Sequence, residues 1–177
     1  LIGGSDLYSG AIRLSNLANS SMAMGGGVTL LAVPNSISNN IIPNILESTI
    51  YPLSSENGFI KFNEKELDKL MSRCRSIAIG MGMGLTDETV KVVIYLLKNY
   101  KGNLIIDADG LNAVARFNIG LLLETNAKVV LTPHIKEFSR LINKDIDYIY
   151  NNYLDCINDF VNKYNVTLIE ISRSNWS

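Results

Sequence analysis

Two carboxylates and an amide follow one apolar run in the middle of the chain. Asp107 and Asp109 flank Ala108 directly after the run "LII", and Asn112 comes three residues later. Alternate residues of an extended chain point to one side, so both carboxylates can face the same space. They could hold Mg²⁺ through water or orient a ligand hydroxyl, with Asn112 beside them. Alternatively, Asp109 caps a helix that begins near Gly110, and Asn112 is an exposed helix residue.

The single histidine lies in the segment "LTPHIKEF". The imidazole of His134 could form a hydrogen bond with an amide or hydroxyl group of a ligand. Pro133 is typical of a first helical turn, which predicts Thr132 as the N-cap and places His134 and Glu137 near the helix start. A lone histidine is often only structural, but a position after a strand end favours a site role for His134.

A glycine-rich turn follows another apolar run. Gly80, Gly82 and Gly84 alternate with methionines before a helix expected to start near Thr86. Glycine leaves backbone N–H groups accessible, and a helix N-terminus favours phosphate, so the turn is a candidate anion site. The spacing matches neither the Rossmann GxGxxG nor the P-loop, which carries a lysine. A tight strand-to-helix turn is an equally good interpretation.

The segment "GGSDLYSGA" near the start of the chain has a similar character. Ser5, Tyr8 and Ser9 place hydroxyl groups beside Gly10 and Ala11. The two small residues could simply let a helix pack closely. The neighbouring hydroxyl groups favour contact with a ligand instead.

These four segments need a scaffold that brings strand ends together. Ligands of open parallel sheets bind outside the carboxyl ends of the strands, which is where the polar and glycine residues stand in this sequence. Continuous apolar runs are typical of strands covered on both faces. They predict strands at residues 28–33, 76–80, 104–107, 128–132 and 166–171.

Helical periodicity alternates with these strands. Val90, Val93 and Leu97 share one face of a helix that Thr86 can cap, and Gly102 follows its end. This alternation predicts an α/β domain with a mainly parallel sheet in three layers, whereas residues 34–62 look irregular. Further helices are expected near residues 63–72, 134–142 and 145–164, and over 7–24 with Leu7, Ala11, Leu14, Ala18 and Met22 on one face.

Composition narrows the class of protein. The 177 residues carry 16 Lys and Arg against 17 Asp and Glu, and no basic run, which excludes the usual footprint of nucleic-acid or anionic-membrane binding. We expect one domain over residues 1–177 and a small-molecule ligand. No apolar stretch reaches the roughly 18 residues of a membrane span, and the basic start of a signal peptide is missing, so we expect a cytoplasmic protein. Cys74 and Cys156 lack metal-site spacing and are interpreted as ordinary thiols.

Taken together and in order, "GGSDLYSGA", "IGMGMGLTDE", "IIDADGLNA" and "LTPHIKEFSRL" resemble the ADP/ATP-dependent NAD(P)H-hydrate dehydratases, also called the YjeF C-terminal domain. The similarity covers nearly the whole chain, and the ordered set is more specific than any single motif. It implies a ribokinase-like, carbohydrate-kinase-like fold. It also implies repair of hydrated NADH or NADPH at the expense of ADP or ATP, with Mg²⁺, by a homo-oligomer that could be a tetramer.

The resemblance also implies roles for single residues. By position, the residues expected to contact the hydrated dinucleotide are Ala11, Gly82 and His134, while those expected to line the same crevice are Asp107, Asp109 and Asn112, with Tyr8 and Gly84 as neighbouring candidates. Met81 and Ile135 stand where the family often has proline. Neither change removes a donor or acceptor side chain, so we expect altered loop stiffness rather than altered chemistry.

Part of the family pattern does not occur in these residues. The family has a "KG…T" segment that contacts the adenylate and a "GGTGD" loop whose Asp acts as the catalytic base. The stretch "VTLIEISRSNWS" resembles the approach to the first of these, with Glu170 near the expected Lys. We therefore expect a partial domain, either a fragment or a natural truncation, and identify no catalytic residue.

Three functions remain open. The leading hypothesis is a dehydratase domain that is active when its remaining part is supplied. Phosphate transfer to the extra ring hydroxyl would turn a poor leaving group into a better one, which explains the nucleotide requirement. The alternatives are an inactive dinucleotide-binding or structural module, and a ribokinase-type kinase for a small alcohol.

Overall fold

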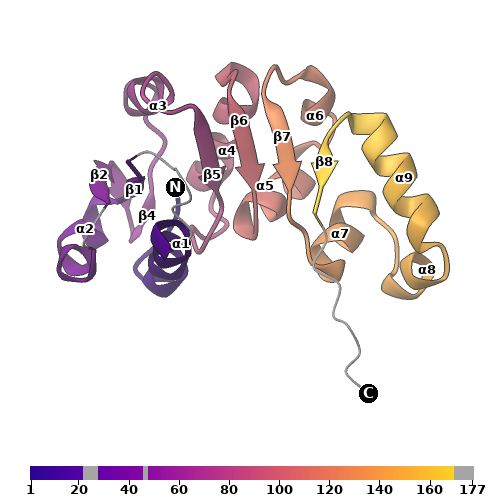
Figure 1. Ribbon diagram of the computed structural model, residues 1–177, viewed down its shortest axis with the longest axis horizontal. Helices are drawn as coiled ribbons and strands as arrows, with labels where there is room; N and C mark the ends of the chain where they lie inside the picture. Colours follow the sequence, from indigo (N-terminus) through magenta and orange to yellow (C-terminus); the bar gives the residue numbers. More distant parts are fainter. Residues whose placement is uncertain (22–27, 46–47, 170–177) are drawn as a thin grey trace.

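Six strands form a parallel sheet in the computed structural model, which describes residues 1–21, 28–45 and 48–169 (Figure 1). Their order across the sheet is β2, β1, β5, β6, β7, β8. Ile2 joins the two parts of the sheet, because it forms parallel bridges with Ala32 and with Ile79. The strands are β1 (Leu30–Pro34), β2 (Thr49–Leu53), β5 (Ser76–Ile79), β6 (Asn103–Ile106), β7 (Lys128–Leu131) and β8 (Thr167–Leu168). The five predicted strands are thus confirmed within the described residues.

The segment expected to be irregular, residues 34–62, is largely regular. Besides β2, it contains α2 (Asn35–Ile41), the 3₁₀ helix η1 (Ile42–Asn44) and an antiparallel hairpin of β3 (Ser55–Glu56) and β4 (Phe59–Ile60). Asn57 and Gly58 connect the hairpin with φ values of 51° and 79°. An Asn-Gly pair with both φ angles positive matches the right-handed twist of the two strands.

Helices cover both faces of the sheet, which confirms the α/β architecture in three layers. In Figure 1, α1 lies in front of the sheet, and α4 and α5 lie behind it. The remaining helices follow the strands that they connect. Their bounds are α1 (Ser9–Ser21), α3 (Glu64–Met71), α4 (Asp87–Asn99), α5 (Asp109–Phe117), α6 (Leu121–Glu124), α7 (Ile135–Ile142), α8 (Ile146–Asn151) and α9 (Tyr153–Tyr164).

Two apolar clusters lie on opposite sides of β1. Leu31 and Val33 pack with Ile12 of α1 in the smaller cluster, and Ala32 points into the larger one. At β6, the two faces of the sheet are buried to different extents. Leu104 is fully buried on the side of the larger cluster, whereas its neighbour Ile105 is only half-buried. Both neighbours are apolar, but the side of β6 that carries Ile105 is covered less completely.

Local signals set the ends of α4. The Thr86 hydroxyl accepts a hydrogen bond from the Thr89 N–H at 3.1 Å, and the Thr89 hydroxyl accepts one from the Thr86 N–H at 2.8 Å. This reciprocal pair confirms Thr86 as the N-cap. The helix expected over 145–164 is instead two helices, α8 and α9, separated at Asn152.

The leucines of the apolar face predicted over residues 7–24 point to solvent, whereas Ala11 of that face is half-buried. Leu7 and Leu14 are 71% and 69% exposed, while the buried side of the helix presents Ile12 and Asn16. The side-chain oxygen of Asn16 accepts a hydrogen bond from the Ser48 hydroxyl. This bond satisfies the polar side chain, so Asn16 can be buried. Met22 and Glu170, named above, lie outside the described residues.

Among the helices in the described part of the chain, none combines the length and the apolar character needed to cross a bilayer.

Candidate functional site

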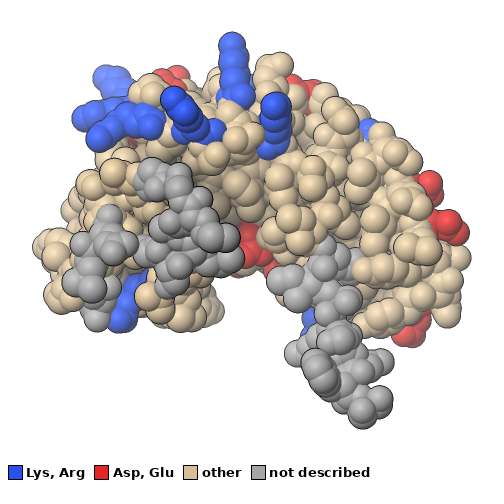
Figure 2. Space-filling model, viewed as in Figure 1, with Lys and Arg blue, Asp and Glu red and all other residues tan. Residues whose placement is uncertain are grey.

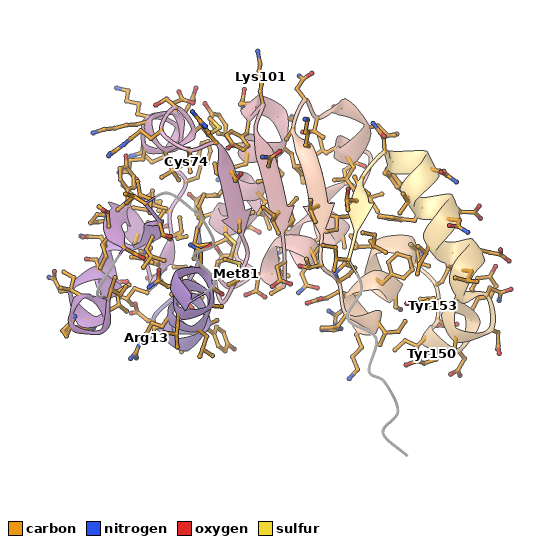
Figure 3. The ribbon with its side chains drawn as sticks, viewed as in Figure 1. Arg13, Cys74, Met81, Lys101, Tyr150 and Tyr153 are labelled. Carbon is orange, nitrogen blue, oxygen red and sulfur yellow. The ribbon has the colours of Figure 1, made fainter. Side chains whose placement is uncertain are left out.

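The turns predicted to form a site follow neighbouring strands. The parallel register pairs Ile79 with Ile106 and Ile106 with Leu131, so the residues after β5, β6 and β7 begin at the same level of the sheet. Figure 2 shows a hollow beneath this edge with acidic atoms visible inside it, while basic side chains gather mostly at the opposite edge. In Figure 3, Met81 lies near α1, and Cys74 and Lys101 lie toward that opposite edge.

The first glycine of the "GMGMG" turn is required by its neighbours. Gly80 has a φ of 122°, and a methyl group on it would lie 1.8 Å from the Asp107 backbone oxygen and 2.6 Å from the Gly110 nitrogen. The Gly80 N–H donates to the Ile2 oxygen at 3.2 Å. This N–H group is therefore not available for a phosphate, and the structural interpretation holds for Gly80.

A strained residue lies between the two aspartates. Ala108 has φ 46° and ψ −117°, a region that residues with a side chain rarely adopt. The Asp107 carboxylate accepts a hydrogen bond from the Ala108 N–H at 2.9 Å, and the Gly110 N–H donates to the Asp107 backbone oxygen at 2.9 Å. Such strain persists only where surrounding bonds hold it, and it is concentrated at functional sites.

Asp109 does not cap its helix. The N-cap of α5 is Ala108 and has no side-chain hydrogen bond, whereas the Asp109 carboxylate accepts a hydrogen bond from the Gly84 N–H at 2.8 Å. The capping interpretation is wrong because Asp109 is already the first residue of α5, and one oxygen of its carboxylate bonds to this N–H of a buried turn 25 residues away. Gly84 is likewise not free to bind phosphate.

Gly82 differs from the other two glycines of its turn. Its N–H has no hydrogen-bond partner among the described residues, and its φ is 66°. A methyl group on Gly82 would lie 2.6 Å from the Tyr8 backbone oxygen and 2.9 Å from the Ala11 side chain. The structure therefore brings three of the predicted site residues together at the start of α1: Tyr8, Ala11 and Gly82.

Ser5 does not serve as a ligand donor in this arrangement. It is fully buried, and its hydroxyl oxygen accepts a hydrogen bond from the Tyr8 N–H at 3.2 Å. Ser5 thereby holds the chain just before α1. Tyr8 itself is 56% exposed.

His134 is the N-cap of α7, so the prediction that Thr132 fills this position is wrong. The Nδ1 atom of His134 accepts hydrogen bonds from the N–H groups of Lys136 and Glu137, at 3.1 and 3.4 Å. The Glu137 carboxylate accepts the His134 N–H at 3.0 Å. The helix begins after His134 because His134 has an extended backbone, with φ −77° and ψ 167°, and forms the reciprocal cap with Glu137.

This cap determines what the imidazole can do. With Nδ1 used as an acceptor, the neutral ring carries its proton on Nε2, which can donate to a ligand. The His134 side chain is 54% exposed, and Nε2 lies 3.4 Å from the Glu137 carboxylate. A structural role and a binding role are thus compatible in one residue.

Asn112 connects two helices. Its side-chain oxygen accepts a hydrogen bond from Arg140 of α7 at 2.9 Å. Arg140 was not foreseen from the sequence, because the contact joins residues 28 positions apart on different helices. Phe59 was also missed, although its ring packs where a side chain on Gly84 would lie.

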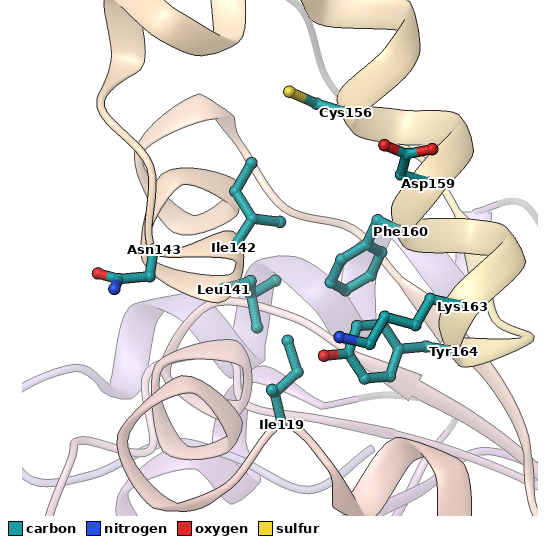
Figure 4. Close-up of a pocket in the computed structure, with 9 residues that line it drawn as sticks. All are labelled: Ile119, Leu141, Ile142, Asn143, Cys156, Asp159, Phe160, Lys163 and Tyr164. Atoms are coloured by element: carbon teal, nitrogen blue, oxygen red, sulfur yellow. The ribbon is translucent and has the colours of Figure 1, made fainter.

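The described residues contain no group of three or more His, Cys, Asp or Glu side chains that could hold a metal. Asp107 and Asp109 each already accept a backbone N–H. A separate groove of about 350 Å³ lies between α7 and α9 (Figure 4). Its lining includes Leu141, Phe160 and Tyr164 but none of the predicted site residues, so it is not part of the candidate site.

The model of one protein family, described as NAD(P)H-hydrate dehydratase, matches residues 1–175. The chain belongs to the NAD(P)H-hydrate dehydratase family. It is 31% identical over 174 residues to the bifunctional NAD(P)H-hydrate repair enzyme Nnr of Dictyoglomus turgidum, covering 96% of this chain and 32% of that protein. It is 32% identical over 144 residues to the ATP-dependent (S)-NAD(P)H-hydrate dehydratase of Ciona intestinalis, covering 80% of this chain and 38% of that protein.

Solved structures of similar proteins share the fold of this dehydratase-family chain. The ADP/ATP-dependent NAD(P)H-hydrate dehydratase of Bacillus subtilis, co-crystallised with ATP and Mg²⁺ and soaked with CoA, superposes with a TM-score of 0.72 at 21% identity. The superposition covers 97% of this chain and 57% of that protein. The protein SMU.573 of Streptococcus mutans gives a TM-score of 0.77 at 20% identity, covered over 58% by 98% of this chain. The chain thus spans about a third of the Dictyoglomus and Ciona proteins and over half of these two solved structures.

Proposed function

We propose that this chain binds the hydrated nicotinamide dinucleotide, NADHX or NADPHX, and takes part in its ADP- or ATP-dependent dehydration to NAD(P)H. The observation that carries the proposal is the meeting of Gly82 with Tyr8 and Ala11 at the start of α1. The Gly82 N–H has no partner among the described residues, so it can donate to a ligand. Family membership identifies the class of ligand.

The site residues divide into two roles in this proposal. Ala11 and Gly82 offer a surface without bulky side chains on which the dinucleotide can lie. His134 offers its Nε2 proton as a hydrogen-bond donor. Asn112 and Asp107 hold the surrounding backbone and helices through the bonds described above.

ADP or ATP with Mg²⁺ would be the co-reactants, as the name of the Bacillus subtilis protein states for that enzyme. The described residues do not build a metal centre of their own. Magnesium is commonly held by one or two carboxylates together with substrate phosphates, so it would arrive with the nucleotide. We assign no catalytic residue, since the family's "GGTGD" loop is not among these 177 residues.

Titration of the 177-residue chain with NADPHX, followed by ATP and Mg²⁺, tests the proposal. We expect binding by calorimetry and no rise in NADPH absorbance. Turnover would show that a group within these residues serves as the base. If NADPHX does not bind at all, the dinucleotide proposal is wrong and a structural module becomes the better interpretation. No observation favours the small-alcohol kinase.

Substitutions at His134 separate its two roles. His134→Ala removes the N-cap and is expected to cost about 1 kcal/mol of stability. His134→Asn supplies a good N-cap but no imidazole, so we expect stability near that of the parent and NADPHX affinity lower by about tenfold, the value of one hydrogen bond. Urea unfolding and calorimetry measure the two effects. Unchanged affinity in His134→Asn would restrict His134 to capping.

We also propose that copies of the chain associate through the exposed side of α1. Leu14 and Leu17 are 69% and 62% exposed and lie three residues apart on one face of α1, and Leu7, just before the helix, is 71% exposed. Sedimentation should show a species larger than one chain, and Leu14→Lys should reduce its size. Leu123→Lys, at an exposed leucine of α6, is the control. A parent that sediments as one chain at every concentration would contradict this interface.

The remaining expectations from the sequence concern the domain organisation, the oligomeric state and the location in the cell. A single domain over residues 1–177 is our proposal for the organisation of this stretch, because Ile2 joins both parts of the sheet. The tetrameric state and the cytoplasmic location stay predictions.

A further inference from the structure

We infer that Asp109 is a positioning residue that holds the turn of residues 80–84, and with it the Gly82 N–H, in place for the dinucleotide. The part of the inference that concerns the ligand rests on the proposed function. The part that concerns the turn rests on geometry alone. The family resemblance places Asp109 in the crevice, and the structure shows that one oxygen of its carboxylate bonds to the turn.

Asp109 bonds to both ends of the turn. Its backbone N–H donates to the Gly80 oxygen at 3.3 Å, and its carboxylate accepts the Gly84 N–H at 2.8 Å. A hydrogen bond to an ionised carboxylate is shorter and about twice as strong as one between neutral groups. One residue therefore sets the distance between the first and last glycines of the turn.

Other groups close off the Gly84 end of the turn. The Thr89 hydroxyl donates to the Gly84 oxygen at 2.9 Å. On the side facing Phe59, a methyl group on Gly84 would lie 2.5 Å from the ring. Gly84 is buried, and Asp109 is the acceptor that its N–H has among the described residues. Without the carboxylate, this buried N–H would lack a partner, which is unfavourable for a buried donor.

Gly82 lies between these anchored ends with no hydrogen bond of its own among the described residues. Its place against Tyr8 and Ala11 is set by the bonds at Gly80 and Gly84, together with the bond that the Gly4 N–H donates to the Met81 oxygen at 2.9 Å. The Asp109 side chain accepts an N–H of the turn itself, and a substitution can remove it without changing the backbone of the turn.

Asp87 shows that a position at a helix start does not explain this contact. Asp87 is the first residue of α4, as Asp109 is of α5. The Asp87 carboxylate is 83% exposed and pairs with Arg116 at 2.9 Å instead of reaching a turn. Both residues complement the positive end of a helix, so Asp87→Ala controls for that shared effect.

The experiment compares Asp109→Ala, Asp109→Asn and Asp87→Ala in the 177-residue chain. Amide hydrogen exchange at Gly82 and Gly84, followed by NMR, reports on the turn, and NADPHX titration reports on the ligand. We expect Asp109→Ala to speed exchange at Gly84 and to lower NADPHX affinity about tenfold, as the loss of one charge-assisted bond predicts. Asp109→Asn keeps a side-chain oxygen and should restore part of both, and Asp87→Ala should change neither.

Each contrary result has a distinct meaning. If Asp109→Ala lowers affinity while Gly84 exchange stays slow, Asp109 contacts the ligand directly and the inference is wrong. If exchange speeds up but affinity does not change, the turn does not position Gly82 for the ligand, which also overturns it. If the parent fails to bind NADPHX, the proposed function falls, whereas the exchange comparison still tests whether Asp109 holds the turn.

Discussion

Replacing Gly80 with alanine is expected to lower the free energy of unfolding by at least about 3 kcal/mol, because the new methyl group has no space and the backbone angle becomes strained. The methyl group would lie 1.8 Å from the Asp107 oxygen, and Gly80 has a φ of 122°. Both obstructing atoms, the Asp107 oxygen and the Gly110 nitrogen, belong to the backbone, so no side chain can rotate away to make room. The two turns, which carry Gly82 and Gly84 on one side and Asp107 and Asp109 on the other, would have to separate.

Urea unfolding followed by far-UV circular dichroism measures this loss. Gly10→Ala is the matched control, since Gly10 lies in α1 and a methyl group there meets nothing within 4 Å. Alanine in a helix is favoured over glycine by about 0.5–1 kcal/mol, so this variant should be as stable as the parent or more so. If Gly80→Ala stays within about 1 kcal/mol of the parent, the close approach of the two turns is not real.

Replacing Phe138 with alanine is expected to cost about 3–5 kcal/mol of stability, the range for removing a buried aromatic side chain. Phe138 is fully buried and contacts the Phe160 ring edge to face, with ring centroids 5.5 Å apart. It holds α7, whose N-cap is His134, against α9. We therefore expect NADPHX affinity to fall as well in a variant that still folds.

Phe117→Ala provides the comparison for Phe138, because it deletes the same side chain at a position that is 56% exposed. Surface substitutions of this kind usually change stability by less than about 0.5 kcal/mol. Thermal or urea unfolding of the two variants side by side gives the difference directly. Equal losses at both positions would show that Phe138 does not anchor α7 as described.

Much of the fold followed from patterns within short stretches of sequence. The five strands were predictable because continuous apolar runs mark strands in a covered parallel sheet. The start of α4 was predictable because Thr86 and Thr89 form their reciprocal cap within one turn of chain. The Asn57–Gly58 hairpin carried an equally local signal, and only the scattered prolines around it obscured that signal.

The roles of the site residues were harder to predict, since their partners lie far away along the chain. Asp109 reaches Gly84 across 25 residues, and Asn112 reaches Arg140 across 28. Each contact depends on the register between neighbouring strands, which no single stretch of sequence specifies. His134 is the intermediate case, because its reciprocal cap with Glu137 is local, yet Pro133 made Thr132 look the better N-cap.

By itself, then, the sequence determined the order of the main strands and helices outside residues 34–62, the family and the set of residues at the strand ends, because periodicity, capping and motifs are properties of neighbouring residues. The tertiary structure alone decided which of those residues have their backbone N–H groups in hydrogen bonds within the protein and which leave this group free. Gly80 and Gly84 proved to be occupied, and Gly82 has an N–H without a partner in the described chain. The reason is that a hydrogen bond between two turns forms only once the sheet has placed both of them at one edge.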